Sequence, residues 1–127
     1  MNEVEQEAGL AKTPGYRYAT EVGKQLFIAG QVPHDSDGQL IGLGDPYAQV
    51  HQCFDNLLKL LEVYGYSVAD IRKLVIYVVG SQSNLGQAWT ATKEKFNGEV
   101  PPATLLGVNT LGHEGQLVEI DATVIKA

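Results

Sequence analysis

The chain has 127 residues, of which 44% are hydrophobic, and its formal net charge is −6 at pH 7. Domains cluster at roughly 100–150 residues, so this length predicts one domain over residues 1–127 and leaves no room for a second. The negative charge repels phosphate backbones and no cluster of lysine and arginine reverses it locally, so we expect no nucleic-acid partner.

Nothing in the sequence predicts a membrane segment or a secretory signal. The apolar stretches 74–79 and 117–125 are much shorter than the roughly 20 residues that span a bilayer. The first residues include Glu3 and Glu5, where a signal peptide would be basic. Cys53 is the single cysteine and has no partner within the chain for a disulfide. We therefore expect a cytoplasmic protein.

The first half of the chain is typical of strands followed by a helix. Residues 16–22 and 25–30 are rich in aromatic and β-branched side chains, and the Gly-Lys pair at 23–24 predicts a hairpin with a short turn. Residues 33–38 have the composition of a turn, and residues 39–41 are expected to form a short return strand.

A helix is predicted to begin at Pro46. Asp45 supplies an N-cap acceptor, and a proline at the first helical position loses no hydrogen bond. Gly65 stands where a left-handed residue would end the helix. Apolar residues recur at steps of three and four, which predicts one buried helix face: Val50, Phe54, Leu57, Leu58 and Leu61.

The second half repeats this order. Ser67 and Asp70 have the spacing of a capping box for one short turn, and the apolar run 73–79 is typical of a central strand covered on both faces. Residues 84–97 predict the second helix, because apolar and small residues repeat at steps of four, three and four: Leu85, Trp89, Thr92 and Phe96. Two strands, 101–108 and 117–124, are expected to form a closing hairpin.

This order of elements predicts an α+β fold, a mixed sheet with two helices on one face. The other face of the sheet would carry Phe27, Leu106 and Val108, which leaves more apolar surface than one helical layer can cover. Large exposed apolar patches usually mark interfaces, so we expect an oligomer.

The sequence resembles the Rid family, also called YjgF, over nearly its whole length. The resemblance rests on segments that occur in the family's order and spacing: Pro14-Gly15-Tyr16, Leu26-Phe27-Ile28-Ala29-Gly30, Gln31-Val32-Pro33, Gln52-Cys53-Phe54-Asp55-Asn56-Leu57, Pro101-Pro102-Ala103-Thr104-Leu105-Leu106-Gly107-Val108 and Leu117-Val118-Glu119-Ile120-Asp121-Ala122-Thr123-Val124. The best-known members are small trimers that hydrolyse reactive imines and enamines to ketoacids and ammonia. The resemblance implies a chorismate-mutase-like β-β-α-β-α-β-β fold, a homotrimer with a barrel-like centre, clefts between subunits and no cofactor.

Glu119 is the first candidate for catalysis. Period two places Val118, Ile120, Ala122 and Val124 on one face of the last strand and Glu119 on the other, with Asp121 and Thr123. If that face meets another subunit, a partly desolvated carboxylate could hold a water or relay a proton. The alternatives are a solvated carboxylate or an ion pair between subunits. The resemblance implies that Glu119 corresponds to the family's cleft glutamate and Tyr16 to its cleft tyrosine. The Tyr16 hydroxyl would then donate a hydrogen bond to the substrate. The alternative is that Tyr16 is an aromatic residue at a strand end without a catalytic role.

Thr104 is the main departure from the family. At this position, after Pro-Ala, the family usually carries an arginine that clamps the substrate carboxylate. A hydroxyl cannot replace the planar fork of a guanidinium, whose charge-assisted bonds contribute roughly 1.5–3 kcal/mol each. We therefore expect weak or no activity on 2-imino acids, unless the cation comes from Lys12, from Lys24 or from a neighbouring subunit's Arg72. Arg17, next to Tyr16, is expected to face the other way.

Other positions of the implied substrate cleft also differ from the family. Leu106 replaces a common cysteine, Ala29 a common serine and Trp89 a helix asparagine, so the cleft should be more apolar. Backbone groups near Gly30 could still polarise a substrate carbonyl or position water.

The sequence favours no metal site. His34, His51 and His113 are widely spaced, and the acidic turn 35–38 lacks the later ligands of a calcium loop. His34 follows the segment that leads to the cleft mouth, where it is either a contributor or a loop residue without special role. Three functions stay open. The first is hydrolytic deamination of an imine, an enamine or a related C–N bond, and the second is binding of a small molecule at the same cleft without turnover. The third is a structural or interaction module, for which Glu119 and Tyr16 would have no role.

Overall fold

A computed structural model describes residues 2–127, and it begins with a short helix, α1 (Glu3–Glu7), that the sequence analysis did not predict. A capping box forms α1: the backbone N–H of Glu5 donates to Asn2 Oδ1 at 2.9 Å, and the backbone N–H of Asn2 donates to Glu5 Oε2 at 3.2 Å. The Tyr64 hydroxyl donates to Glu5 Oε1 at 2.6 Å. This tertiary contact holds a helix that is too short to be stable alone.

The predicted N-terminal hairpin is confirmed, although its strands are shorter than expected. β1 (Ala19–Val22) pairs antiparallel with β2 (Gln25–Ile28) across a turn in which Gly23 has φ +59°. Residues 16–18 precede the regular strand as an irregular segment. The expected return strand at 39–41 is reduced to a single bridge between His34 and Leu40.

Both predicted helices are confirmed. α2 (Pro46–Val63) begins after Asp45, whose Oδ1 accepts from the backbone N–H of Ala48 at 3.1 Å, and Gly65 beyond its end has φ +76°. α3 (Gln82–Lys95) is capped by Ser81 and begins two residues earlier than predicted. Between the helices, the capping box of Ser67 forms the 3-10 turn η1 (Val68–Asp70).

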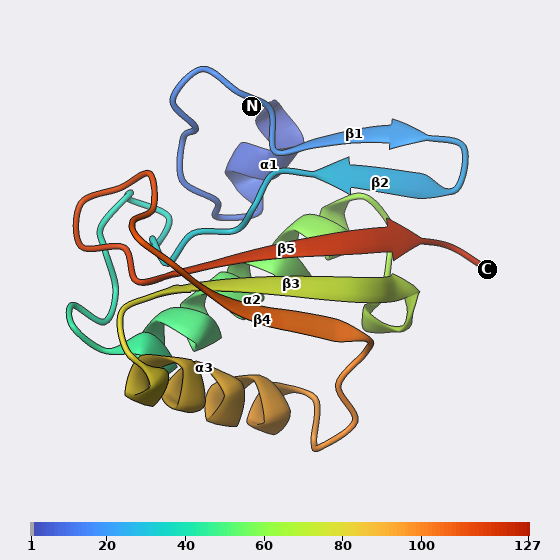
Figure 1. The fold of residues 1–127 in the computed structure, drawn as a ribbon. Helices are drawn as coiled ribbons and strands as arrows, with labels where there is room; N and C mark the ends of the chain where they lie inside the picture. Colours follow the sequence, from blue (N-terminus) through green and yellow to red (C-terminus); the bar gives the residue numbers. More distant parts are fainter. Residues whose placement is uncertain (1) are drawn as a thin grey trace.

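The sheet corrects the expected closing hairpin. β3 (Ile71–Val79) lies between β4 (Ala103–Val108), which runs parallel to it, and β5 (Val118–Ile125), which runs antiparallel, in the order β1-β2-β5-β3-β4 (Figure 1). A hairpin between neighbouring strands needs a loop of about two to five residues. The longer connection 109–117 instead carries the chain past β3, so that β5 fills the centre of the sheet.

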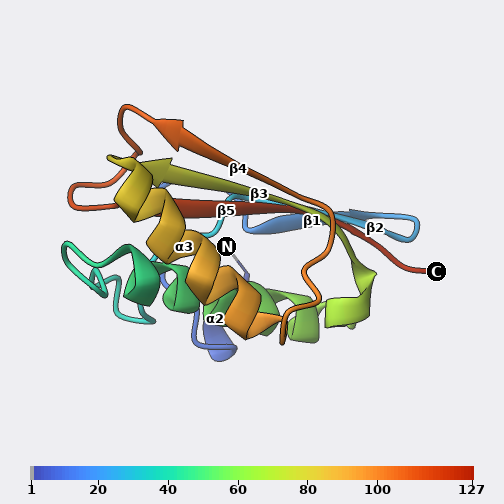
Figure 2. The ribbon, with the colours of Figure 1, turned by 60° about the horizontal axis from the view of Figure 1, so that its bottom comes forward.

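The core lies between the sheet and the helices, which cover one face (Figure 2). The predicted period of β5 is confirmed, because Val118, Ile120 and Val124 are fully buried against this layer. Phe54 of α2 and Phe96 pack edge to face, with ring centroids 5.3 Å apart. Together these features confirm the mixed α+β, chorismate-mutase-like fold.

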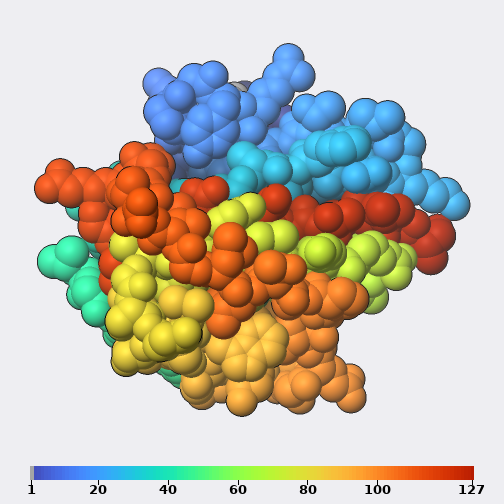
Figure 3. All heavy atoms as spheres, viewed as in Figure 1, coloured from blue at the N-terminus to red at the C-terminus, as the bar shows by residue number. Residues whose placement is uncertain are grey.

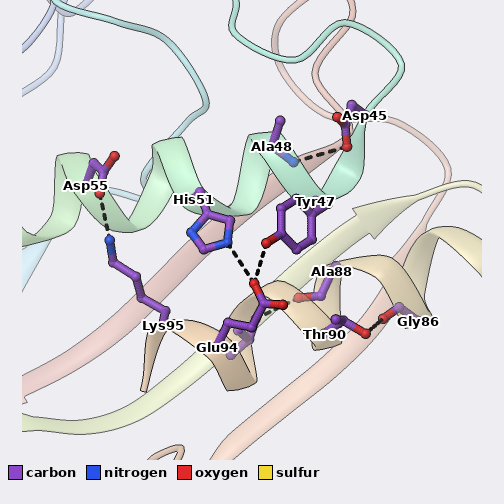
Figure 4. A network of polar contacts seen from close by, with 11 residues as sticks. Asp45, Tyr47, Ala48, His51, Asp55, Gly86, Ala88, Thr90, Glu94 and Lys95 are labelled. Atoms are coloured by element: carbon purple, nitrogen blue, oxygen red, sulfur yellow. Dashed lines mark hydrogen bonds and ion pairs between the residues drawn. The ribbon is translucent and has the colours of Figure 1, made fainter. Parts of the chain in front are cut away.

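Polar contacts join the two long helices at their exposed surface (Figure 4). The Tyr47 hydroxyl donates to Glu94 Oε2, which also lies 3.5 Å from His51 Nε2, and Lys95 Nζ lies 2.7 Å from Asp55 Oδ1. Exposed pairs of this kind contribute about 0–1 kcal/mol each, so the apolar core carries most of the packing. His51 thereby belongs to the helical layer.

No helix of the described residues lies over the opposite face of the sheet, and Figure 3 views the molecule from this side. We call this the outer face; it carries Val75 and Tyr77 of β3, Leu106 of β4 and the half-exposed Phe27 of β2.

Within residues 2–127, no helix combines the length and the apolar character that crossing a membrane requires.

Candidate functional site

The outer face brings Glu119 beside Tyr77. In the strand register, Tyr77 of β3 is opposite Glu119 of β5 on one side and Leu106 of β4 on the other. Val75 likewise stands between Asp121 and Thr104 in the adjacent row. Glu119 and Asp121 therefore share a face, as period two predicts, and Thr104 lies on that face two strands away.

A β-bulge next to Glu119 reshapes the β2 side of the sheet. Leu26 pairs with Val124, and Gln31 bridges to Ile120, so the β2 side carries one more residue than β5 between these two points. Gln31 N donates to Ile120 O at 2.7 Å and Ile120 N donates to Gln31 O at 3.0 Å, which restores the register beyond the bulge. Bulges are common beside active sites because they redirect side chains and backbone.

Gly30, within this bulge, lies directly under the Glu119 carboxylate. A β-carbon at position 30 would overlap Glu119 Oε2 and would lie only 2.8 Å from Cδ. The backbone at Gly30 has no positive φ, so close approach, and not turn conformation, explains the glycine.

Gln116 holds the other carboxylate oxygen. Its Nε2 donates to Glu119 Oε1 at 3.2 Å and to Val118 O at 3.0 Å, and its Oε1 accepts from the backbone N–H of His113 at 3.1 Å. Gln116 is only 4% exposed, so these bonds fix its amide firmly. Among the described residues, Glu119 Oε2 has no such partner.

This carboxylate faces a hollow of about 260 Å³ on the outer face, which we call the carboxylate hollow. It is lined by Ile28, Gly30, Tyr77, Leu111, Glu119 and Asp121. Apolar and aromatic walls around two carboxylates favour a small molecule with a polar or cationic group.

Tyr16 lies in the irregular segment before β1 and is 39% exposed. Partial burial, and secondarily the negative charge of Glu119, raise the pKa of the Tyr16 phenol. Its hydroxyl therefore stays protonated near neutral pH and is available as a donor. The Thr13 hydroxyl donates to the Tyr16 carbonyl oxygen, which anchors this segment.

The remaining predicted residues are dispersed within one chain. Thr104 is exposed near the sheet edge, and Leu106 is half-buried in the row of Glu119. Ala29 precedes Gly30 and its carbonyl accepts from Gln31 Nε2 at 2.8 Å. Trp89 packs against the core from α3, on the helical side of the sheet, and so does not meet Glu119 of the same chain.

The candidate cations have separate surroundings. Arg17 lines a hollow with Asn2 and Glu5, and Lys12 lines a hollow that also contains Tyr16. Lys24 Nζ donates to Ala127 O at 3.2 Å, and Arg72 Nε donates to Ile125 O at 2.8 Å. Residues 2–127 contain no group of three or more His, Cys, Asp or Glu side chains arranged to hold a metal ion. Cys53 is fully buried, and its burial, with a smaller contribution from Glu119, raises its thiol pKa well above the usual value.

Sequence reasoning missed Gln116, Tyr77 and Leu111. Gln116 precedes β5 by two positions, in a segment without periodicity, and Leu111 lies in the β4–β5 connection. Tyr77 carried a usable signal, since it alternates with the buried Ile76 and Val78, but its neighbours depend on strand order.

Comparisons with known proteins agree with this architecture. A family model described as Endoribonuclease L-PSP matches residues 7–126. The chain is 32% identical over 111 residues to a RutC family protein of Pyrococcus horikoshii, covering 87% of this chain and 86% of that protein. Among solved structures, it is similar to the Rid family protein YyfA of Yersinia pestis, at 25% identity and TM-score 0.83 over 94% of each chain. It is also similar to the YjgF gene product of E. coli, at 23% identity and TM-score 0.82 over 95% of each chain.

The one-sided helical layer and the carboxylate on the open sheet face define a protein of the chorismate-mutase-like α+β class. The matched segments extend over almost the entire sequence. The chain belongs to the Rid family, also called YjgF.

Proposed function

We propose that this protein hydrolyses the C–N bond of a small imine, enamine or related nitrogenous metabolite, with Glu119 as the proton relay. The observation that carries the proposal is the Glu119 carboxylate itself, with Oε1 held by Gln116 and Oε2 over Gly30 at a hollow. A fixed carboxylate with one uncommitted oxygen is suited to accept a proton from water.

The proposed reaction consumes one water and releases ammonia. Water adds to the carbon of the C=N bond while Glu119 accepts its proton, and the nitrogen gains protons as the C–N bond breaks, which leaves a carbonyl and ammonia. Tyr16 orients the substrate or the water through its protonated hydroxyl. The raised pKa of Tyr16 supports a donor role.

The site is proposed to lie between subunits of a homotrimer. The outer face carries half-buried apolar side chains, and no helix of the described chain covers it. Residues that one chain keeps apart, Thr104 and Trp89, would then contribute to the clefts, with Leu106, Ala29 and Gly30 as further substrate contacts. We place this trimer in the cytoplasm.

Thr104 sets the substrate preference. No guanidinium follows Pro102-Ala103, so a 2-imino acid would lack the bidentate clamp on its carboxylate. We expect poor release of ammonia from 2-iminopropanoate and 2-iminobutanoate compared with arginine-bearing relatives.

Thr104 also favours a second candidate, a binding protein that uses the same cleft without turnover. A bound ligand that is recovered unchanged after prolonged incubation and raises the melting temperature would identify it. RNA cleavage, named in the description of the family model, is disfavoured by the net charge of −6.

The decisive experiment measures ammonia release from a panel of imines generated in situ, with Glu119→Gln compared with Glu62→Gln, which changes an exposed carboxylate of α2. We expect Glu119→Gln to lose at least about 100-fold in kcat, as removal of a general base does, and Glu62→Gln to match the parent. Equal rates in both variants would exclude Glu119 as the relay.

A further inference from the structure

A second hollow, of about 140 Å³, shares no lining residue with the carboxylate hollow and has a different chemical character. It lies between the N-terminal segment, the β2–α2 connection and the β4–β5 connection. We call it the donor hollow, and the side chains with polar groups that line it are Lys12, Thr13, Tyr16, Tyr18, His34 and His113.

No carboxylate is among the described residues that line the donor hollow, although the chain as a whole has a net charge of −6. The nearest one in sequence, Asp35, is committed to its own turn: Oδ1 accepts from the backbone N–H groups of Asp37 at 2.9 Å and Gln39 at 3.0 Å. Lys12 has no ion-pair partner in residues 2–127. The polar part of the lining therefore consists of side chains that can donate hydrogen bonds, together with the cation Lys12, while Glu119, Glu5 and Asp35 act on Tyr16, Tyr18 and His34 from outside it.

The two histidines form the far wall. Their ring centroids are 4.8 Å apart with the rings tilted by 56°, and His34 Nδ1 is buried without a hydrogen-bond partner. Buried polar atoms are nearly always paired in native proteins, so this unpaired ring nitrogen sets His34 apart from the other residues that line the hollow.

The walls of the donor hollow are fixed by hydrogen bonds. Asn56 Nδ2 donates to Val32 O at 2.9 Å and to His34 O at 2.8 Å, which ties this connection to α2. The Tyr18 hydroxyl donates to Ala11 O at 2.6 Å and secures the N-terminal segment. The hollow is thus built in advance, as binding sites usually are.

Gln116 joins the two hollows. It accepts from the backbone of His113, which lines the donor hollow, and donates to Glu119, which lines the carboxylate hollow. Gly30 and Val32, which line one hollow each, are separated only by Gln31. These links place the two hollows near each other in the fold, as the effect of the Glu119 charge on Tyr16 of the donor hollow also indicates.

We propose that the donor hollow binds an anionic group of the substrate whose C–N bond reacts at Glu119. The substrate class is then a carboxylic acid in which a spacer separates the carboxylate from the C–N bond. In a 2-imino acid the carboxylate is bonded directly to the C=N carbon, and both groups would have to fit at Glu119. Lys12 supplies the charge and Tyr16 and the histidines supply donors. This inference rests on the proposed function in one respect only, namely that the C–N bond lies at Glu119.

The test uses two isomeric ketoacids as product analogues, 5-oxohexanoate and 2-oxohexanoate, with 5-oxohexanamide as the uncharged control. Dissociation constants are measured by calorimetry for the parent, for Lys12→Gln and for Lys24→Gln, a matched exposed lysine in the β1–β2 turn. We expect 5-oxohexanoate to bind at least about tenfold tighter than 2-oxohexanoate, and Lys12→Gln to remove that preference.

Three outcomes overturn the inference: equal affinity for the two isomers, equal affinity for the acid and the amide, or no difference between Lys12→Gln and Lys24→Gln. If the parent protein releases no ammonia but still binds 5-oxohexanoate through Lys12, the proposed hydrolysis is disproved and the anion site remains supported. Glu119→Gln should abolish turnover while retaining Lys12-dependent binding, which separates the two hypotheses.

Discussion

The carboxylate of Glu119 lies against the α-carbon of Gly30, in space that any other residue at position 30 would fill. The bulge between β2 and β5 creates this contact, and the amide of Gln116 completes it from the opposite side. The position of the proposed proton relay thus depends on a missing side chain as much as on the hydrogen bond.

Gly30→Ala should displace the Glu119 carboxylate and lower kcat by about 10- to 100-fold, because small misplacements of a reacting group carry a cost of that size. The control is Gly86→Ala in α3, where the new β-carbon would meet no atom within 4 Å apart from its chain neighbours and the backbone of its own helix. Gly86→Ala should stabilise the protein by about 0.5–1 kcal/mol in urea unfolding and leave kcat unchanged. Normal activity in Gly30→Ala would contradict the close-contact argument.

Gln116→Leu should lower kcat by about tenfold while KM changes little, because it frees Glu119 without touching the walls of either hollow. Loss of the bonds to Val118 and His113 should also lower the free energy of unfolding by about 1–3 kcal/mol. Gln116→Glu keeps one acceptor but places a second negative charge beside Glu119. It should therefore shift the pH profile of kcat towards higher pH. The control is Gln87→Leu, on the exposed side of α3. A parental kcat in Gln116→Leu would show that Gln116 is a purely structural residue.

Thr104→Arg should create activity on 2-iminopropanoate. A guanidinium on the outer face provides two charge-assisted bonds of roughly 1.5–3 kcal/mol each, so kcat/KM should rise by at least about tenfold. The measurement is ammonia release, with Thr110→Arg as an exposed control outside the sheet. The prediction fails if both variants behave as the parent does.

Leu106→Asp should prevent trimer formation, because a charge in the middle of an apolar contact surface is costly to bury. Val68→Asp, at a 45% exposed position on η1, should leave assembly unchanged. Sedimentation velocity distinguishes the two results. Trimers in Leu106→Asp would show that the outer face is not the interface.

Acid should weaken the fold through His34. Burial, and secondarily the neighbouring His113, lower the pKa of His34, while Asp35 opposes this shift. Its folded pKa lies below the unfolded value of about 6.5, so the stability it contributes is present above that pH and is lost as pH falls below it. His34→Gln should therefore reduce the drop in unfolding free energy between pH 7.5 and pH 5.5; an unchanged drop would assign it to other groups.

Local sequence signals predicted local structure well. Asp45 and Pro46 placed the start of α2, the capping box at Ser67 predicted η1, and the alternation in β5 identified its buried face. Strand order was not accessible in the same way, because the alternation of 101–108 and 117–124 is the same whether the strands pair with each other or with β3. The short α1 escaped because its stability comes from Tyr64, far away in the sequence.

The candidate site could be predicted only in part, because local periodicity gives the face of a residue but not its neighbours from other segments. The face of Glu119 follows from period two, but its contacts with Gly30 and Gln116 depend on a bulge and a connection whose shape no periodicity encodes. The tilted ring contact of His34 with His113 joins two loops that are distant in sequence.

The position of β5 has a consequence for biosynthesis. It is the last of the five strands to leave the ribosome, yet it lies in the centre, between the early pair β1–β2 and the later pair β3–β4. Without β5, the pairs β1–β2 and β3–β4 have no ladder that joins them into one sheet, and long-range pairing of this kind is slow to form. The proposed relay residue is therefore assembled in the same step that joins the sheet into one unit.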